Sequence, residues 1–291
     1  MNKKYKSRIK NVGQGLILLL LTILLAIVLR VFFMAAFTIS GISMYPTVDT
    51  GDKVVVNKQI PGPRIIRYGN PEEGIKPDIR RIKGLRRIRR NDVLLLNKPY
   101  NRTESFAPDW NVHYIKRCVA IPGDTFYIEQ GIYKVKNSPD TIGNYHNQYL
   151  FSLEDEASIP KGIFRCYPKR NPHYQWTAKS FGPLYVPRKN DTLAIDSINI
   201  ALYQDMIEYE TGGNIQISDH QVYLNGRILT HYTFGMNYYF VAGDYVSNSV
   251  DSRYWGPLPE DHIVGKAAFV LSSRDKYTGK MRWNRFLKAV R

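Results

Sequence analysis

Cysteine is nearly absent from this 291-residue chain, which contains only Cys118 and Cys166. Two cysteines are too few for the disulfide framework of a small secreted scaffold, and their spacing does not match a zinc site. We interpret them as two unlinked thiols, and a pairing between them stays open. A hydrophobic core must therefore hold the fold, and 44% apolar residues with 13% aromatics are enough to build one.

Acidic residues are scarce relative to basic ones. The chain has 25 Asp and Glu against 41 Lys and Arg, which leaves a formal net charge of +16. Such a charge implies attraction to an anionic partner, either nucleic acid or the headgroups of an anionic membrane. Composition alone does not choose between these two partners.

A long apolar run lies near the N-terminal end. Leu16–Phe37 comprises 22 residues whose only charge is Arg30, and residues 1–12 before it carry five basic and no acidic side chains. As a helix this run covers about 33 Å, enough for a hydrocarbon core of about 30 Å. Because basic flanks stay in the cytoplasm, we predict a cytoplasmic tail at 1–12 and a transmembrane anchor at 13–37. The remainder then lies on the outer face of the cytoplasmic membrane, as in a single-pass protein.

A cleavable secretory leader is the alternative interpretation of this segment, since it also begins with basic residues. Its apolar region, however, usually has about 7–15 residues and ends at a small-residue cleavage site. The run in this chain is longer and ends in Met34-Ala35-Ala36-Phe37. We therefore favour an uncleaved anchor.

After the anchor, short β-branched or apolar segments are typical of strands. Asn225-Gly226, between two alternating segments, is the commonest short hairpin signal. Helix signals are sparse, and only Ile198–Tyr209 has apolar residues near helical spacing. We therefore predict a mainly β fold with one short helix in this part of the chain. The predicted strand segments are Lys53–Lys58, Asp92–Leu96, Tyr114–Ile121, Thr125–Glu129, Tyr238–Ala242 and Lys266–Leu271.

Residues 64–90 form a strongly basic segment, with ten Lys and Arg against three acidic side chains. Its Pro and Gly residues and its lack of an apolar period predict a loop. A nucleic-acid site is the alternative, but aromatic residues that stack on bases are almost absent, and the segment is expected to lie outside the cytoplasm. We therefore expect a solvated or membrane-facing loop and no nucleic-acid partner.

Three segments carry residues suited to catalysis. Ile39–Thr47 (ISGISMYPT) begins directly after the anchor, Tyr114–Asp124 contains YIKR and IPGD, and Gly243–Gly256 contains GD and NSVDSRYWG. In this order, and starting just outside a membrane helix, the segments closely resemble the sequence boxes of type I signal peptidases. The resemblance runs from the anchor to about Ser272 and is weak through residues 137–217.

The resemblance implies a membrane-bound serine endopeptidase that removes N-terminal signal peptides from exported preproteins after small residues. It implies a β-rich catalytic domain at 38–124 and 235–291, with an inserted β-rich, non-catalytic domain at 125–234. By position in the boxes, Ser43 is the nucleophile and Lys116 is the general base. The other implied site residues are Ser249 and Asp251, which support catalysis, and Asp244 and Arg253, which belong to a structural ion-pair network.

The chemistry of the residues favours the same assignment. A serine hydroxyl is a poor nucleophile unless a neighbouring base removes its proton, and the three segments contain no histidine. A lysine can act as that base only when its amine is neutral, which requires its pKa to fall by about two to four from 10.4. The apolar neighbours of Lys116 suit the necessary burial, and an oxygen from Ser249 is a candidate for orienting the amine. Such a mechanism needs no cofactor and no metal.

An oxyanion requires hydrogen-bond donors that are in place before the reaction. The backbone N–H of Ser43 is one candidate. Many relatives place a serine two residues before the nucleophile as the second donor, whereas this chain has Gly41 there and Ser40 one position earlier. We name Ser40 as a third residue that supports catalysis, and the identity of the second donor stays open. The third segment departs from the commoner Gly-Asp-Asn-Arg pattern, because Gly243-Asp244 is followed by Tyr245-Val246.

On the substrate side, the resemblance implies an extended peptide beside strands, with shallow pockets for small residues. By motif position, Ile39, Met44, Tyr114 and Ile115 line these pockets, and a core role for Met44 stays open. The expected partners are exported preproteins and the lipid bilayer. The oligomeric state does not follow from the sequence.

Other functions remain as alternatives. Ser43 taken alone is a turn hydroxyl, and Lys116 taken alone is a strand lysine that points at solvent. A DNA-bound self-cleaving regulator of the same fold would suit the positive charge, but the export-oriented anchor argues against it. A catalytically silent membrane-anchored binding protein would retain the fold, but intact Ser43 and Lys116 argue against that alternative.

Overall fold

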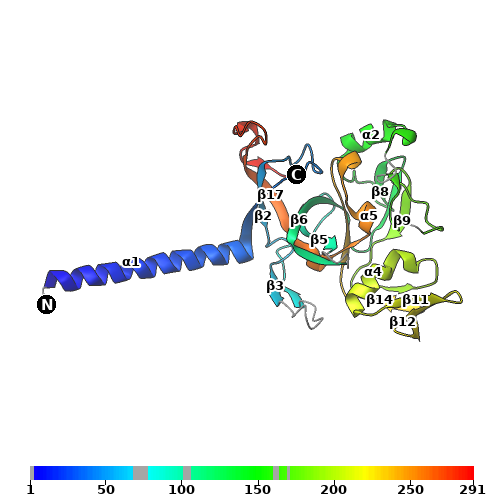
Figure 1. Ribbon diagram of the computed structural model, residues 1–291, viewed down its shortest axis with the longest axis horizontal. Helices are drawn as coiled ribbons and strands as arrows, with labels where there is room; N and C mark the ends of the chain where they lie inside the picture. The colour runs from blue at the N-terminus through cyan, green and yellow to red at the C-terminus, as the bar shows by residue number, and fades with distance from the viewer. Residues whose placement is uncertain (1–2, 68–77, 101–105, 160–163, 169–170) are drawn as a thin grey trace.

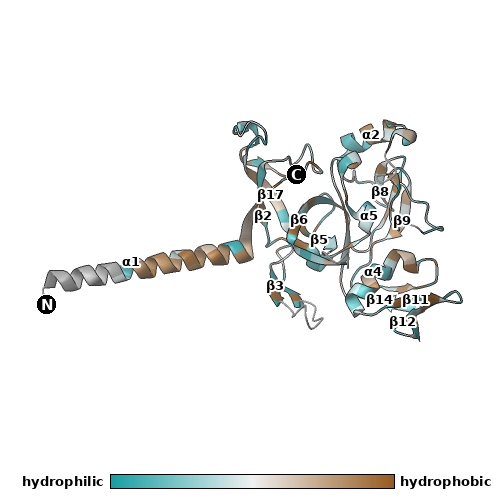
Figure 2. Ribbon diagram, viewed as in Figure 1, coloured by the Kyte–Doolittle hydropathy of each residue, from teal (hydrophilic) through white to brown (hydrophobic). Residues whose placement is uncertain are grey.

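The computed structural model describes residues 3–67, 78–100, 106–159, 164–168 and 171–291 (Figure 1). A long helix, α1 (Lys3–Val28), continues into a π-helical segment, η1 (Leu29–Phe33), and projects away from the rest of the chain. Its stretch Gly13–Phe33 has a mean hydropathy of 3.0 and is not buried by the rest of the protein. Figure 2 shows this apolar stretch as the brown part of the projecting helix. Its length and hydropathy fit a single membrane-spanning helix.

The helix ends earlier than the sequence predicts. Residues of β1 (Met34–Thr38) pair antiparallel with β2 (Asp52–Asn57), and Ala35 is buried by this pairing. The helical part therefore ends at Phe33, four residues before the end of the segment 13–37 that is predicted as the anchor. Hydropathy misses this boundary because it does not distinguish apolar residues that lipid covers from those that a sheet covers.

The largest sheet is antiparallel and has eight strands in the described part of the chain, in the order β1-β2-β17-β5-β6-β15-β16 with β18 also paired to β17. Its strands β5 and β6 form a long hairpin, and β6 also pairs with β15, so strands far apart in sequence become neighbours. The chain between β6 and β15 therefore leaves the sheet and returns to its next position. The remaining bounds are β5 Val93–Tyr100, β6 Phe106–Ala120, β15 Tyr238–Ala242, β16 Leu258–Pro259, β17 Ile263–Ser273 and β18 Lys288–Ala289.

In its described residues, the excursion between β6 and β15 contains three small sheets and the α-helices α2 and α4. The predicted hairpin at Asn225-Gly226 is confirmed, since both residues have positive φ and join β12 to β13. The predicted helix is confirmed as α4, which ends at Gly212 in the left-handed conformation. The elements are β7 Thr125–Glu129, β8 Ile132–Val135, α2 Tyr145–Leu153, η3 Glu156–Ser158, β9 Phe181–Tyr185, β10 Thr192–Ala194, α4 Ile200–Thr211, β11 Ile215–Ser218, β12 Gln221–Leu224, β13 Arg227–Ile228 and β14 His231–Thr233.

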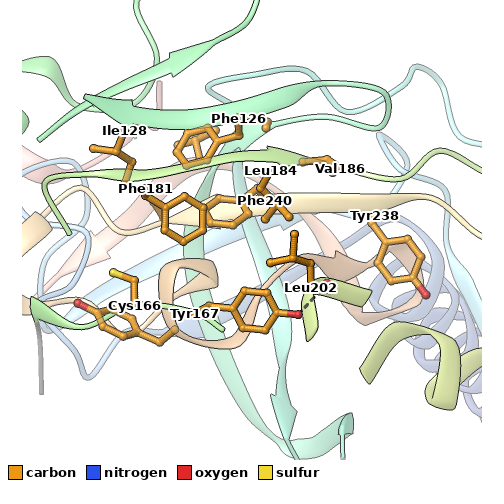
Figure 3. Packing of buried hydrophobic residues seen from close by; sticks show 14 of the residues in the cluster. Phe126, Ile128, Cys166, Tyr167, Phe181, Leu184, Val186, Leu202, Tyr238 and Phe240 are labelled. Atoms are coloured by element: carbon orange, nitrogen blue, oxygen red, sulfur yellow. Dashed lines mark hydrogen bonds between the residues drawn. The ribbon is translucent and has the colours of Figure 1, made fainter. Parts of the chain in front are cut away.

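The excursion shares a core with the main sheet. Phe240 on β15 stacks on Phe126 of β7 with ring centroids 4.5 Å apart, and Phe181 of β9 lies 5.4 Å from Phe240. Figure 3 shows these three rings together, with Tyr167 bonded to the backbone of Leu202 below them. The predicted insertion at 125–234 is therefore fixed against the sheet by continuous apolar packing.

Part of the basic segment predicted as a loop is a β-hairpin. Strands β3 (Arg64–Arg67) and β4 (Asp78–Arg81) pair antiparallel, while residues 68–77 lie outside the described part of the chain. The guanidinium of Arg81 donates to the carbonyls of Glu260 and Ile263, at 2.6 and 2.7 Å. The sequence predicts a loop here because tertiary contacts of charged side chains produce no alternation of apolar and polar residues.

Candidate active site

Ser43 lies on the turn that follows β1, at the edge of the main sheet. The next residue, Met44, is fully buried, and its carbonyl accepts a hydrogen bond from the N–H of Val48. The carbonyl of Ser43 accepts from the N–H of Tyr245 at 3.0 Å. The buried methionine and these backbone bonds hold the turn so that the Ser43 side chain points away from the core beneath it.

Lys116 lies near the end of β6 and is 3% exposed. Its Nζ is 2.7 Å from Oγ of Ser43, a hydrogen-bond contact between residues 73 positions apart. Burial lowers the pKa of Lys116 from 10.5 to about 8, although the carboxylate of Asp251 acts to raise it. The amine is therefore neutral in a substantial fraction of molecules near pH 8.

Asp251 is the centre of a second, fully buried group. Its carboxylate accepts from Oγ of Ser249 at 2.7 Å, from the N–H of Gly243 at 2.9 Å and from the guanidinium of Arg253 at 2.9 Å. Burial acts to raise the pKa of Asp251, but Arg253 and Lys116 outweigh it and hold that pKa below its ordinary value. Asp251 also caps the short helix α5 (Ser252–Trp255) by accepting from the backbone of Arg253.

Ser249 is placed differently from the sequence expectation. In the described part of the chain its hydroxyl donates to Asp251, and no hydrogen bond joins it to Lys116. A Cβ at Gly243 would lie 2.2 Å from Oγ of Ser249 and 2.5 Å from the carbonyl oxygen of Ser43. Only glycine at position 243 therefore fits against both the side chain of Ser249 and the backbone carbonyl of Ser43.

Asp244 and Arg253, expected in one ion-pair network, belong to separate ion pairs. The carboxylate of Asp244 accepts two bonds of 2.6 Å from the guanidinium of Arg117 and a third from the hydroxyl of Thr47. Sequence reasoning missed Arg117, although it directly follows Lys116 in the second segment. The pair joins the strand that carries Lys116 to the turn that carries Ser43, because Thr47 lies on that turn.

A cleft of about 830 Å³ opens in front of Ser43 and Lys116. One wall is the end of β1 and the turn after it, from Phe37 to Ser43, and the opposite wall is residues 111–116 of β6. Of the predicted substrate-binding residues, Ile39, Tyr114 and Ile115 line this cleft. Met44 does not line it, because its side chain is 0% exposed and packs in the core beneath the turn.

Ser40 also lines the cleft, and it is exposed. The backbone N–H of Ser43 is free of a hydrogen bond to any of the residues that the structure describes, so it can donate to a ligand. Within the same residues, no group of His, Cys, Asp and Glu side chains is arranged to hold a metal ion, and no disulfide joins the two buried cysteines. The arrangement has the parts that acyl transfer needs: a hydroxyl, an adjacent amine of lowered pKa and an available backbone donor.

Comparison with known proteins gives one consistent result. The family described as signal peptidase, peptidase S26, matches residues 12–167 and 186–272. Signal peptidase I of Buchnera aphidicola from Schizaphis graminum is 28% identical to this chain, covering 88% of this chain and 73% of that protein. Signal peptidase I of Aquifex aeolicus is 27% identical, covering 90% and 83%, and that of Helicobacter pylori strain 26695 is 26% identical, covering 91% and 88%.

Proposed function

Because the chain belongs to the signal peptidase family, peptidase S26, it is a serine endopeptidase, and we propose that it removes N-terminal signal peptides from exported preproteins with Ser43 as nucleophile and Lys116 as general base. The observation that carries the proposal is the 2.7 Å contact between Oγ of Ser43 and Nζ of Lys116 at the cleft. Lys116 combines this contact with a pKa lowered to about 8 by burial. Only a neutral amine accepts the proton of the hydroxyl, so the lowered pKa is what makes Lys116 suitable.

The proposed reaction has two halves. In the first, neutral Lys116 takes the proton of Ser43 while Oγ attacks the scissile carbonyl carbon, and the protonated amine then delivers that proton to the nitrogen of the leaving peptide. The C–N bond breaks and an acyl-enzyme ester remains on Ser43. In the second half, Lys116 takes a proton from water while the water oxygen attacks the ester carbonyl carbon. The bond between that carbon and Oγ then breaks, the new C-terminal carboxyl group is released, and Lys116 returns the proton to Oγ.

The oxyanion needs donors at the mouth of the cleft. We assign one to the backbone N–H of Ser43. The hydroxyl of Ser40 is our candidate for the second donor, because Ser40 lines the cleft and the position two residues before the nucleophile is Gly41. Asp251, Ser249 and Arg253 support the base from behind rather than touching the substrate.

The substrate strand is proposed to lie between the two cleft walls. An extended peptide between residues 37–42 and residues 111–115 can pair its main chain with either side, which gives register, while side-chain pockets select small residues. Ile39 and Ile115 are the apolar residues that we assign to these pockets. The shallow form of such pockets excludes larger side chains.

Membrane attachment completes the proposal. The apolar stretch Gly13–Phe33 is proposed to span the cytoplasmic membrane with residues 1–12 in the cytoplasm and the catalytic part on the outer face. The apolar leader of a preprotein lies in the same bilayer, so anchoring the enzyme raises the local concentration of its substrate. We propose preproteins and the lipid bilayer as its partners, and no nucleic acid.

Cleavage of a purified preprotein by the full-length enzyme in detergent or liposomes tests this function. Ser43→Ala and Lys116→Ala are each expected to reduce the cleavage rate by at least about 10³-fold, and the double variant is expected to be scarcely slower than either. Thermal unfolding of each variant is the control for folding. Appreciable cleavage by Ser43→Ala, in a preparation free of host peptidase, would refute the nucleophile assignment.

A further inference from the structure

Helix α2 of the excursion contacts the turn that carries Ser43 through the side chain of Asn147. The amide nitrogen of Asn147 donates to the carbonyl of Tyr45 at 3.0 Å and to the carbonyl of Asp244 at 2.8 Å. Tyr45 follows Ser43 by two residues, and Asp244 precedes the residue whose N–H binds the carbonyl of Ser43. One amide thus joins the two loops that hold the nucleophile.

The helix that carries Asn147 is itself firmly fixed. Asn144 caps its first turn by accepting from the N–H of Asn147. Gln148 is fully buried, accepts from the N–H of Tyr133 and donates to the carbonyl of Ile142. Phe151, one turn further on, packs in the core that the excursion shares with the main sheet. In Figure 1, α2 lies at the upper end of the excursion.

A second group of hydrogen bonds connects the residues just before α2 to β6, the strand that carries Lys116. Asn91 accepts from the N–H of Gly143 at 2.8 Å and donates to the carbonyl of Thr141 at 2.9 Å. The carbonyl of Asn91 in turn accepts from the guanidinium of Arg117, the neighbour of Lys116, at 2.9 Å. Hydrogen bonds therefore connect the start of α2 to the strand that carries Lys116, and Asn147 connects the same helix to the turn that carries Ser43.

We propose that Asn147 is a positioning residue, through which the excursion holds Ser43 at proton-transfer distance from Lys116. Ser43 lies on a turn, outside the strand pairing that fixes Lys116, so its position depends on contacts made by the loops. A displacement of about 1 Å at a reacting group costs up to about 100-fold in rate. This inference rests on the proposed function, because it assigns the excursion a role in the same reaction.

The test compares four variants in α2 and at its N-cap, in the full-length enzyme with a preprotein substrate. Asn147→Ala removes both donors, His146→Ala changes an exposed neighbour on the same helix, and Asn144→Ala removes the helix cap while keeping Asn147. Asn147→Ala is expected to lower kcat by roughly 10- to 100-fold, with KM within about twofold and the acidic limb of the pH–rate profile unmoved. Asn147→Asp, which presents oxygen to the same two carbonyls, is expected to be at least as slow. His146→Ala is expected to behave as the wild type.

Three outcomes would overturn the proposal. The first is a kcat for Asn147→Ala equal to that of His146→Ala. The second is a change confined to KM, which would make Asn147 a substrate contact. The third is a loss in Asn147→Ala that Asn144→Ala reproduces at the same melting temperature, which would indicate helix stability alone. Failure of the proposed function is recognised separately, because Ser43→Ala would then retain cleavage.

Discussion

Lys116 in the main sheet and Lys179 in the excursion are both buried, at 3% and 9% exposure, but their surroundings differ. Nζ of Lys179 donates to the carbonyls of Ser152 and Glu154, at the C-terminal end of α2, where unpaired carbonyls favour a cation. Nζ of Lys116 has one hydrogen-bond contact among the residues that the structure describes, the hydroxyl of Ser43. The two buried amines therefore differ in their acceptors, because Nζ of Lys179 faces two carbonyls whereas Nζ of Lys116 faces the hydroxyl that it is proposed to deprotonate.

Replacing each lysine by arginine is the sharpest way to test this comparison. Arginine keeps the positive charge and the donors but is not deprotonated in proteins. Lys116→Arg is therefore expected to reduce preprotein cleavage by at least about 10³-fold, whereas Lys179→Arg is expected to stay within about twofold of the wild type. Cleavage rates of the two purified variants provide the measurement. Activity retained by Lys116→Arg would mean that this residue acts as a fixed charge and not as a base.

Replacing each lysine by methionine should change stability in opposite directions. The pKa of Lys116 falls from 10.5 in the unfolded chain to about 8 in the fold, which disfavours its charged form by about 3 kcal/mol. At pH 7 the lysine is charged in both states, so Lys116→Met is expected to raise the free energy of unfolding by up to about 3 kcal/mol. Lys179→Met removes charge-assisted bonds to two carbonyls and is expected to lower it by about 1.5–3 kcal/mol.

The pH dependence provides the control for that experiment. As pH rises from about 8 towards 10.5, the unfolded chain keeps its proton at position 116 while the folded protein loses it. The free-energy cost of burying the charged amine therefore disappears over this range. The stability gain of Lys116→Met should therefore shrink over this range and vanish above it. Urea unfolding of the full-length variants in detergent at several pH values measures the gain. A gain that does not change with pH would assign it to packing and not to the buried charge.

The sequence predicts that Ser43 and Lys116 act together, and it does so because the signals are local. Ser43 and Lys116 each lie in a short segment whose order and spacing are readable, and Asn225-Gly226 is an equally local hairpin signal. The prediction of one short helix missed α2, which has nine residues and weak apolar periodicity. Its start is set by the cap at Asn144, a residue type that is also common in loops.

What the sequence does not predict depends on contacts between distant residues. Arg117 and Asp244 are 127 positions apart, and neither sequence segment indicates which carboxylate the guanidinium of Arg117 binds. Met44 follows the nucleophile directly, so its motif position suggested a substrate contact, but the turn directs its side chain into the core. The orientation of a side chain on a turn is set by the packing beneath the turn, which one sequence does not contain.

The smallest expected effect concerns Ser249, which sequence reasoning placed beside the amine of Lys116 and which donates to Asp251 in the structure. The wild-type cleavage rate at subsaturating substrate should rise with pH along a limb of apparent pKa about 8, as Lys116 loses its proton. Ser249→Ala leaves the carboxylate of Asp251 with one hydrogen-bond donor fewer. The negative charge of Asp251 then acts more strongly on Lys116 and favours its charged amine. We therefore expect this limb to move upward by roughly 0.3, with a rate loss of less than about tenfold at high pH. A loss of more than about 100-fold with the limb unmoved would instead mean that the Ser249 hydroxyl orients the amine directly.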